Sequence, residues 1–157
     1  MASTQTGAIT SSDPVLFAYD GSELAAFAIE QSAKQLAAGR EALVLCVWQP
    51  ADVGFTPSGE RHFDADQAAE VQRAAEETAA RGAALAAKAG FRPRSMTVKA
   101  APTWKGIVET AEQCQASLIV LGSHRRSGLA GHLLGSVAAA VVAHSTSSVL
   151  VVHHQES

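Results

Sequence analysis

The sequence has few cysteines, few aromatic residues and no long apolar segment. Two cysteines, Cys46 and Cys114, occur among 157 residues, and aromatic residues make up 5% of the chain. Both cysteines lie in apolar surroundings, so we expect buried thiols in a reducing compartment and no disulfide framework. No apolar run approaches the roughly 18 residues that a membrane-spanning helix needs. We therefore expect a soluble, cytoplasmic protein without a membrane partner.

A strong excess of charge of one sign is also lacking. The chain has 12 basic and 15 acidic side chains and a formal net charge of -3, which gives no electrostatic reason to expect nucleic acid as a partner. Residues 1–12 are small and polar, with neither the basic region nor the apolar core of a signal peptide, so we expect a disordered tail. Residues 13–157 are predicted to form one domain, long enough to bury a sizeable core.

Five short apolar runs alternate with helical patterns along this domain. The predicted strands cover residues 14–19, 42–48, 95–99, 118–121 and 148–152, and the predicted helices cover residues 23–38, 65–88, 104–115 and 136–144. The alternating polarity of residues 95–99 is typical of an edge strand, and residues 51–64 have the composition of a mobile surface loop. This order predicts an α/β fold with a doubly wound, five-stranded parallel sheet and helices on both faces, because each parallel connection needs a crossover.

A glycine-rich stretch, residues 122–136, follows the fourth predicted strand and leads into the last predicted helix. Ligands of doubly wound sheets bind beyond the carboxyl ends of the strands, where the strand order reverses. Glycines allow close approach of the backbone to a ligand, and Ser136 and the free N–H groups of the helix start point donors at an anion. A phosphate is the natural occupant, although loops are also rich in glycine for purely conformational reasons.

The same stretch resembles the nucleotide-binding motif of the universal stress protein family. That motif is a glycine, two residues, a second glycine, nine residues, and then glycine followed by serine or threonine. Gly122 fills the first place and Gly135 and Ser136 fill the last two, with the spacing intact. Arg125 occupies the position of the second glycine of the motif. Its side chain either crowds a phosphate there or pairs with it through the guanidinium group.

The resemblance covers nearly the whole domain and implies a Rossmann-like sheet of order 3-2-1-4-5 that binds ATP, with Mg²⁺ as an accompanying ion. It also implies a homodimer that pairs through the last strand, whose apolar edge would otherwise favour aggregation. Adenine and ribose would lie near the first two strands, and the phosphates on the glycine-rich stretch. Carried over residue by residue, the base and sugar site is Ala18, Tyr19, Asp20 and Val47, the phosphate site is Gly122, Arg125, Gly135, Ser136 and Val137, and one wall is Pro102 and Thr103.

Other interpretations of these residues stay open. Asp20 precedes Gly21 and so has an equal claim to be a turn residue, and both roles are compatible. The histidines lack the helical spacing with an acid that a zinc site shows. Trp48 and Trp104 flank the predicted crevice, where they either stack on a base or simply pack. Serines in the glycine-rich stretch lack the strand, nucleophile and helix arrangement of a hydrolase.

Three functions compete at this level. The first is an adenine-nucleotide-binding regulatory module of the stress response, for which slow ATP hydrolysis is compatible but no catalytic base can be assigned. The second is a dimeric interaction protein of the same family that binds no nucleotide. The presence of Arg125 in place of the second glycine favours this interpretation. The third, a phosphoacceptor receiver or a flavin carrier, fits less well, because Asp20 stands alone after the first strand and the glycine-rich stretch follows the fourth.

Overall fold

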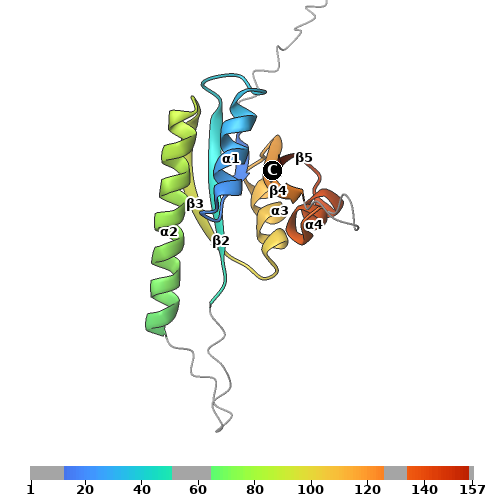
Figure 1. The fold of residues 1–157 in the computed structure, drawn as a ribbon. Helices are drawn as coiled ribbons and strands as arrows, with labels where there is room; N and C mark the ends of the chain where they lie inside the picture. Colours follow the sequence, from blue (N-terminus) through green and yellow to red (C-terminus); the bar gives the residue numbers. More distant parts are fainter. Residues whose placement is uncertain (1–12, 51–64, 126–133, 156–157) are drawn as a thin grey trace, which may run out of the picture.

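The computed structural model describes residues 13–50, 65–125 and 134–155 (Figure 1). The predicted tail, the predicted loop at 51–64, residues 126–133 of the glycine-rich stretch and the Arg125 side chain lie outside the described residues. The elements are β1 (Val15–Ala18), α1 (Glu23–Ala33), β2 (Glu41–Trp48), α2 (Ala65–Lys88), β3 (Arg92–Lys99), α3 (Thr103–Gln113), β4 (Leu118–Arg125), α4 (Ser136–His144) and β5 (Ser148–Gln155).

The five strands form one parallel sheet in the order β3-β2-β1-β4-β5. This confirms the expected α/β, Rossmann-like fold. The shortest strand, β1, lies at the centre, where Val15 pairs with Ala42 of β2 on one side and with Leu118 of β4 on the other. Val15, Leu16 and Phe17 are fully buried because helices cover both faces of this strand. The reversal of strand order therefore falls between β1 and β4, beside the end of β1.

The helices form one layer on each face of the sheet (Figure 1). On one face, α1 and α2 cover an apolar cluster that contains Phe17, Ile29 and Val44. On the other face, α3 and α4 cover a second cluster that contains Leu16 and Leu45. Successive strand residues alternate between the two clusters, as the two-residue period of a strand requires.

Helix α2 lies close to the sheet because glycine stands at one contact. A Cβ atom on Gly82 would come within 2.5 Å of Tyr19 Cδ1 and 2.7 Å of Val44 Cγ1. At its C-terminus, Gly90 has a φ of 102°, and Phe91 N–H donates to Ala86 O at 3.0 Å. This left-handed C-terminal cap ends the helix and turns the chain into β3.

Several elements differ in extent from the prediction, and α1 and β4 show why. Helix α1 ends at Ala33, five residues early, where the buried Ser32 hydroxyl donates to Ile29 O at 2.9 Å and the Lys34 N–H shifts to Gln31 O and Ser32 O. Serine hydroxyls that bond back to the preceding turn compete with the helix in this way. Strand β4 continues beyond Gly122 to Arg125 because β5 pairs with it throughout.

The outer strand β3 carries features that discourage further pairing. Arg92, Pro93 and Arg94 begin it, and both arginines are exposed. Proline and charged side chains are common on edge strands because they hinder addition of another strand. This confirms the expected edge position of residues 95–99, although the strand begins three residues earlier.

Candidate functional site

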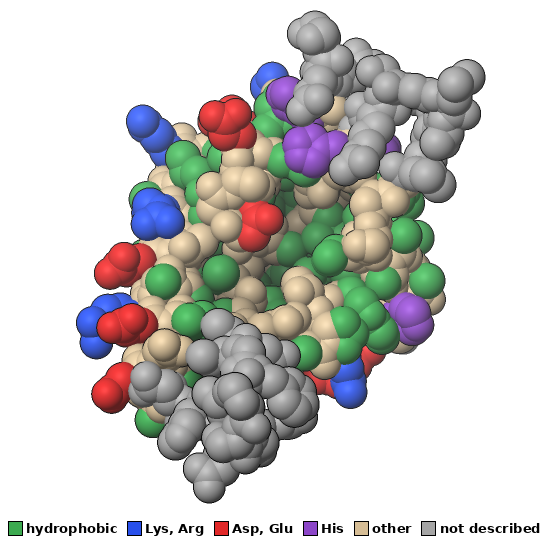
Figure 2. All heavy atoms as spheres, turned by 60° about the horizontal axis from the view of Figure 1, so that its bottom comes forward, with side chains coloured by type: hydrophobic (Ala, Val, Ile, Leu, Met, Phe, Trp, Pro, Cys, Tyr) green, Lys and Arg blue, Asp and Glu red, His purple; other side chains and the backbone are tan. Residues whose placement is uncertain are grey.

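A hollow opens at the carboxyl ends of β1, β2 and β4, where the strand order reverses. It measures about 150 Å³. Figure 2 looks onto this edge and shows apolar side chains on the floor of the hollow, with carboxylates near its rim. The lining residues come from all three strands and from the first turns of α1, α3 and α4: Ala18, Tyr19, Asp20, Ser22, Leu24, Ala25, Leu45, Val47, Thr103, Ile107, Leu121, Gly122 and Val137. This is the position at which doubly wound sheets bind ligands.

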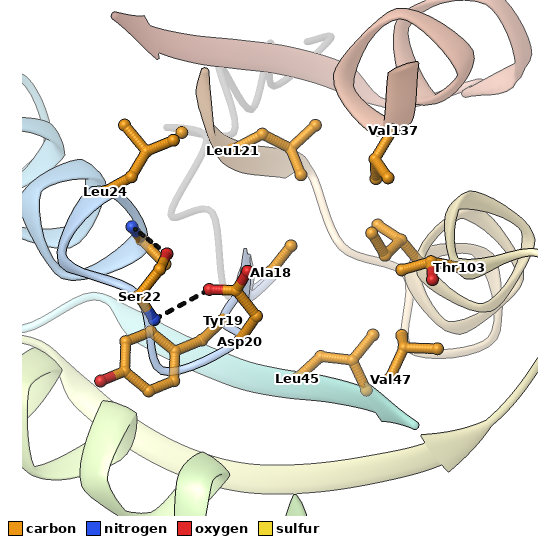
Figure 3. A pocket seen from close by; sticks show the side chains of 13 residues that line it. Ala18, Tyr19, Asp20, Ser22, Leu24, Leu45, Val47, Thr103, Leu121 and Val137 are labelled. Carbon is orange, nitrogen blue, oxygen red and sulfur yellow. Dashed lines mark hydrogen bonds between the residues drawn. The ribbon is translucent and has the colours of Figure 1, made fainter. Parts of the chain in front are cut away.

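The acidic turn after β1 is held by its own side chains. Asp20 Oδ1 accepts a hydrogen bond from Ser22 N–H at 3.0 Å, and Ser22 Oγ accepts one from Ala25 N–H at 3.1 Å (Figure 3). Ser22 is thus the N-cap of α1. Asp20 is a turn residue and also lines the hollow, so both of the roles considered for it are compatible with the geometry.

Tyr19 contributes to the hollow differently from its neighbours. Its ring packs in the cluster under α1 and α2, against the position of Gly82, whereas Ala18 belongs to the cluster under α3 and α4. The aromatic ring therefore lies on the opposite face of the sheet from Ala18. Tyr19 N–H donates to Leu45 O at 2.9 Å, so the backbone of Tyr19 extends the pairing of β1 with β2 beyond Ala18.

Cys46 lies on the same face as α2, packed with Ala75 and Ala79. Burial, and after it the negative charge of Asp20, raises the pKa of the Cys46 thiol, and Arg81 acts in the opposite direction. The thiol therefore stays protonated at neutral pH and is a poor nucleophile. Both cysteines are free thiols, and Cys114 is partly buried.

The start of α3 forms the wall opposite the acidic turn. Thr103 lines the hollow, and its Oγ1 accepts a hydrogen bond from Gln49 Nε2 at 3.4 Å. Pro102 is the N-cap of this helix and lies outside the lining. The indole of Trp104 stacks on the His144 ring of α4, with centroids 4.1 Å apart, so this indole packs between two helices.

The two glycines of the motif have different surroundings. A Cβ on Gly122 would lie 2.7 Å from Leu24 Cγ and 2.9 Å from Leu24 O, so this glycine lets the first turn of α1 approach β4. Gly135 has a φ of −54° and is the N-cap of α4, and among the residues that the structure describes its Cβ would meet only Ser123 Oγ, at 4.0 Å. Packing therefore explains Gly122, whereas neither backbone strain nor packing against the described residues explains Gly135.

The structure brings most of the predicted site residues together. Seven of them line the hollow: Ala18, Tyr19, Asp20, Val47, Thr103, Gly122 and Val137. Gly135 and Ser136 lie at the exposed start of α4, just before Val137. Arg125 ends β4, paired in register with Gln155. Within the described residues, no group of three or more acidic, histidine or cysteine side chains could hold a metal ion, and no helix is long and apolar enough to cross a membrane.

Comparison with known proteins decides the family. The model of the universal stress protein family matches residues 12–153. The chain belongs to the universal stress protein family. Its fold agrees with that assignment, since solved universal stress proteins have the same architecture, and a comparison with curated protein sequences found no significant match.

Several solved structures are similar to this universal stress protein chain over almost its whole length. Hypothetical protein MJ0577 is 24% identical, with a TM-score of 0.73, and the alignment covers 93% of this chain and 99% of that one. A universal stress protein in complex with cAMP is 26% identical, with a TM-score of 0.65 and coverage of 91% and 98%. The Archaeoglobus fulgidus universal stress protein in complex with dAMP is 21% identical, with a TM-score of 0.57 and coverage of 88% and 96%.

The contrast between the two motif glycines gives a stability prediction for this universal stress protein. Gly122→Ala should lower the free energy of unfolding by about 1–3 kcal/mol, because the methyl group would overlap with the side chain and the backbone carbonyl of Leu24. Gly135→Ser should change it by only a few tenths of a kcal/mol, roughly, because serine is a good N-cap residue. Urea unfolding followed by circular dichroism measures both. Equal losses in the two variants would contradict this assignment of roles.

Proposed function

We propose that this universal stress protein is an adenine-nucleotide-binding regulatory module of the stress response. The observation that carries the proposal is the hollow at the reversal of strand order, where apolar walls, a carboxylate and the starts of three helices meet. Pockets for small ligands are typically apolar with a few placed polar groups. A 26% identical relative was solved in complex with cAMP, which supports the same ligand class here.

The chemistry of the walls suggests how the ligand lies. Ala18, Val47 and Ile107 offer a flat apolar surface suited to a purine ring. Asp20 has one oxygen engaged with the turn and a second that could accept a hydrogen bond from a ribose hydroxyl. The phosphates would then extend past Gly122 towards the start of α4.

The N-terminus of α4, the positive end of the helix dipole, suits the phosphate groups. Its first N–H groups have no partner within the helix, and the N-cap Gly135 supplies no side-chain hydrogen bond. Such helix starts bind phosphate. With ATP, Mg²⁺ would bind mainly through the phosphates and water, as this ion usually does. Occupancy would favour one arrangement of the surrounding segments and so alter what the protein binds.

The proposal is tested by calorimetric titration of the nucleotide-free protein with adenosine, AMP, cAMP and ATP with Mg²⁺, together with mass spectrometry of any ligand retained on purification. We expect micromolar dissociation constants. Ala18→Phe should abolish binding because the side chain at this position faces into the hollow (Figure 3). Ala38→Phe, in an exposed turn after α1, is the matched control and should bind normally.

Absence of binding up to millimolar ATP would contradict the proposal. It would favour the second candidate, a homodimeric interaction protein. The observation that supports that candidate is the outer position of β5, whose central residues Val149, Leu150, Val151 and Val152 are apolar and only partly buried in the single chain.

A further inference from the structure

Ser123 connects strand β4 to the start of α4. Its hydroxyl oxygen accepts a hydrogen bond from the Gly135 N–H at 3.2 Å, across twelve residues of chain. Ser123 is 3% exposed, one of three buried polar residues in the described part of the chain. Its backbone lies in the sheet, in register with His153 of β5. The acceptor is therefore fixed by a rigid element, while the donor belongs to the segment that leads into the helix.

The bonded residue stands at the start of α4. Gly135 is the N-cap, and its carbonyl accepts from Ala139 N–H at 2.9 Å. A glycine N-cap has no side chain with which to orient the first turn, so the contacts of the Gly135 backbone add to the core packing of Ala138 and Val141 in fixing that turn. Ser123 accepts from the N–H of the N-cap residue itself, the donor that the N3 side chain satisfies in a capping box, so this contact leaves the N–H groups of the first turn available.

The first turn of α4 lies where its N–H groups could contact a ligand in the hollow. Val137 lines the hollow, whereas Ser136 is exposed, so the N–H groups of the first turn, which have no partner within the helix, lie at the rim of the site. Hydrogen bonds to an anion weaken steeply with small errors in distance and angle. Anchoring Gly135 to the sheet keeps these donors in place before a ligand arrives, which reduces the entropy lost on binding.

We infer that Ser123 is a positioning residue for the phosphate group of the ligand, and that it sets the preference of this site for nucleotides over nucleosides. The inference rests on the proposed function and adds to it the residue that aligns the phosphate donors. In that proposal the base and ribose lie against β1, β2 and α3. Substitution of Ser123 should therefore leave the binding of the base and ribose unaffected.

The experiment compares Ser123→Ala with Ser123→Thr, which keeps the hydroxyl, in the full chain. Calorimetry with adenosine and with AMP gives the ratio of their dissociation constants. In the alanine variant we expect AMP to bind about 5- to 100-fold more weakly, because poorly aligned N–H groups lose part of their hydrogen bonding to the phosphate, with adenosine within about twofold of the parent. The threonine variant should recover most of the AMP affinity. Amide hydrogen exchange at Gly135 should be faster in the alanine variant alone.

Each other outcome is decisive. Equal loss of AMP and adenosine affinity would show a merely structural role and overturn the inference, as would unchanged AMP affinity in Ser123→Ala. Equal binding of AMP and adenosine by the parent protein would overturn the inference while leaving nucleoside binding intact. Failure of the parent protein to bind either ligand would overturn the proposed function itself, and unchanged exchange at Gly135 would then also remove the anchoring role of Ser123.

Discussion

Phe17→Ala should lower the free energy of unfolding by about 3–5 kcal/mol, the usual cost of truncating a fully buried phenylalanine. Phe17 is 1% exposed on the central strand β1, and its ring meets the edge of the Phe91 ring at a centroid distance of 5.2 Å. Strands on both sides and helices on both faces leave little freedom for the site to collapse around the cavity. For a domain of this size the midpoint of thermal unfolding should fall by roughly 6–20 °C, measured by calorimetry.

Phe27→Ala is the matched control for that experiment. Phe27 is only partly buried on α1, where its ring meets the His154 ring edge-on, with the ring centroids 4.8 Å apart. The same truncation there removes less buried surface and leaves no enclosed cavity, so the loss should be clearly smaller. If the two variants lost the same stability, the two-layer core around β1 would not be the main source of stability.

Asp20→Asn should weaken the binding of adenosine about 10- to 150-fold, corresponding to about 1.5–3 kcal/mol for a hydrogen bond to a charged group. The asparagine side-chain oxygen can still accept from Ser22 N–H, so the turn after β1 is preserved while the negative charge is removed. The variant therefore separates the ligand role of Asp20 from its turn role. Calorimetric titration gives the affinity, and urea unfolding checks that stability is retained.

Glu23→Gln supplies the control for charge. Glu23 is an exposed acid in the first turn of α1, three residues from Asp20, and it lies outside the lining of the hollow. Its substitution removes the same charge nearby and should change adenosine affinity by less than about twofold, because exposed charges are strongly screened. An equal effect of both substitutions would indicate a general field effect. No effect of Asp20→Asn would leave Asp20 as a turn residue alone.

The sequence patterns predicted most elements because local and tertiary preferences agree in them. The whole of α2 was predicted to the residue, since an alanine-rich amphipathic segment is bounded there by a glycine cap. Strands β4 and β5 extend into polar residues beyond Gly122 and Val152, which periodicity could not reveal. Their hydrogen bonds join backbone groups, and these pair irrespective of side-chain polarity.

The hollow was predicted in outline, and the lining residues that were missed are apolar except for Ser22. Leu24, Leu45 and Ile107 line the hollow, but each belongs to a pattern that a core residue satisfies equally well. Their spacing did contain a signal. Leu45 lies two residues before Val47 on the same face of β2, and Ile107 lies four residues after Thr103 on one side of α3. When one residue of a strand is predicted to line a site, the residue two positions away lies on the same face and is a candidate as well. On a helix the same holds for residues three or four positions away.

The central position of β1 has a consequence for synthesis of the chain. Val15–Ala18 is made first but receives its partner in β4 only when Leu118–Val120 has been added. That is roughly 100 residues later, or about 5–20 s at usual rates of translation. During this interval one edge of the most apolar strand stays open while β2 covers the other. The nascent chain should therefore expose an apolar strand edge until the fourth strand leaves the ribosome, and the native sheet can close only after β5, the last of its strands, has been made.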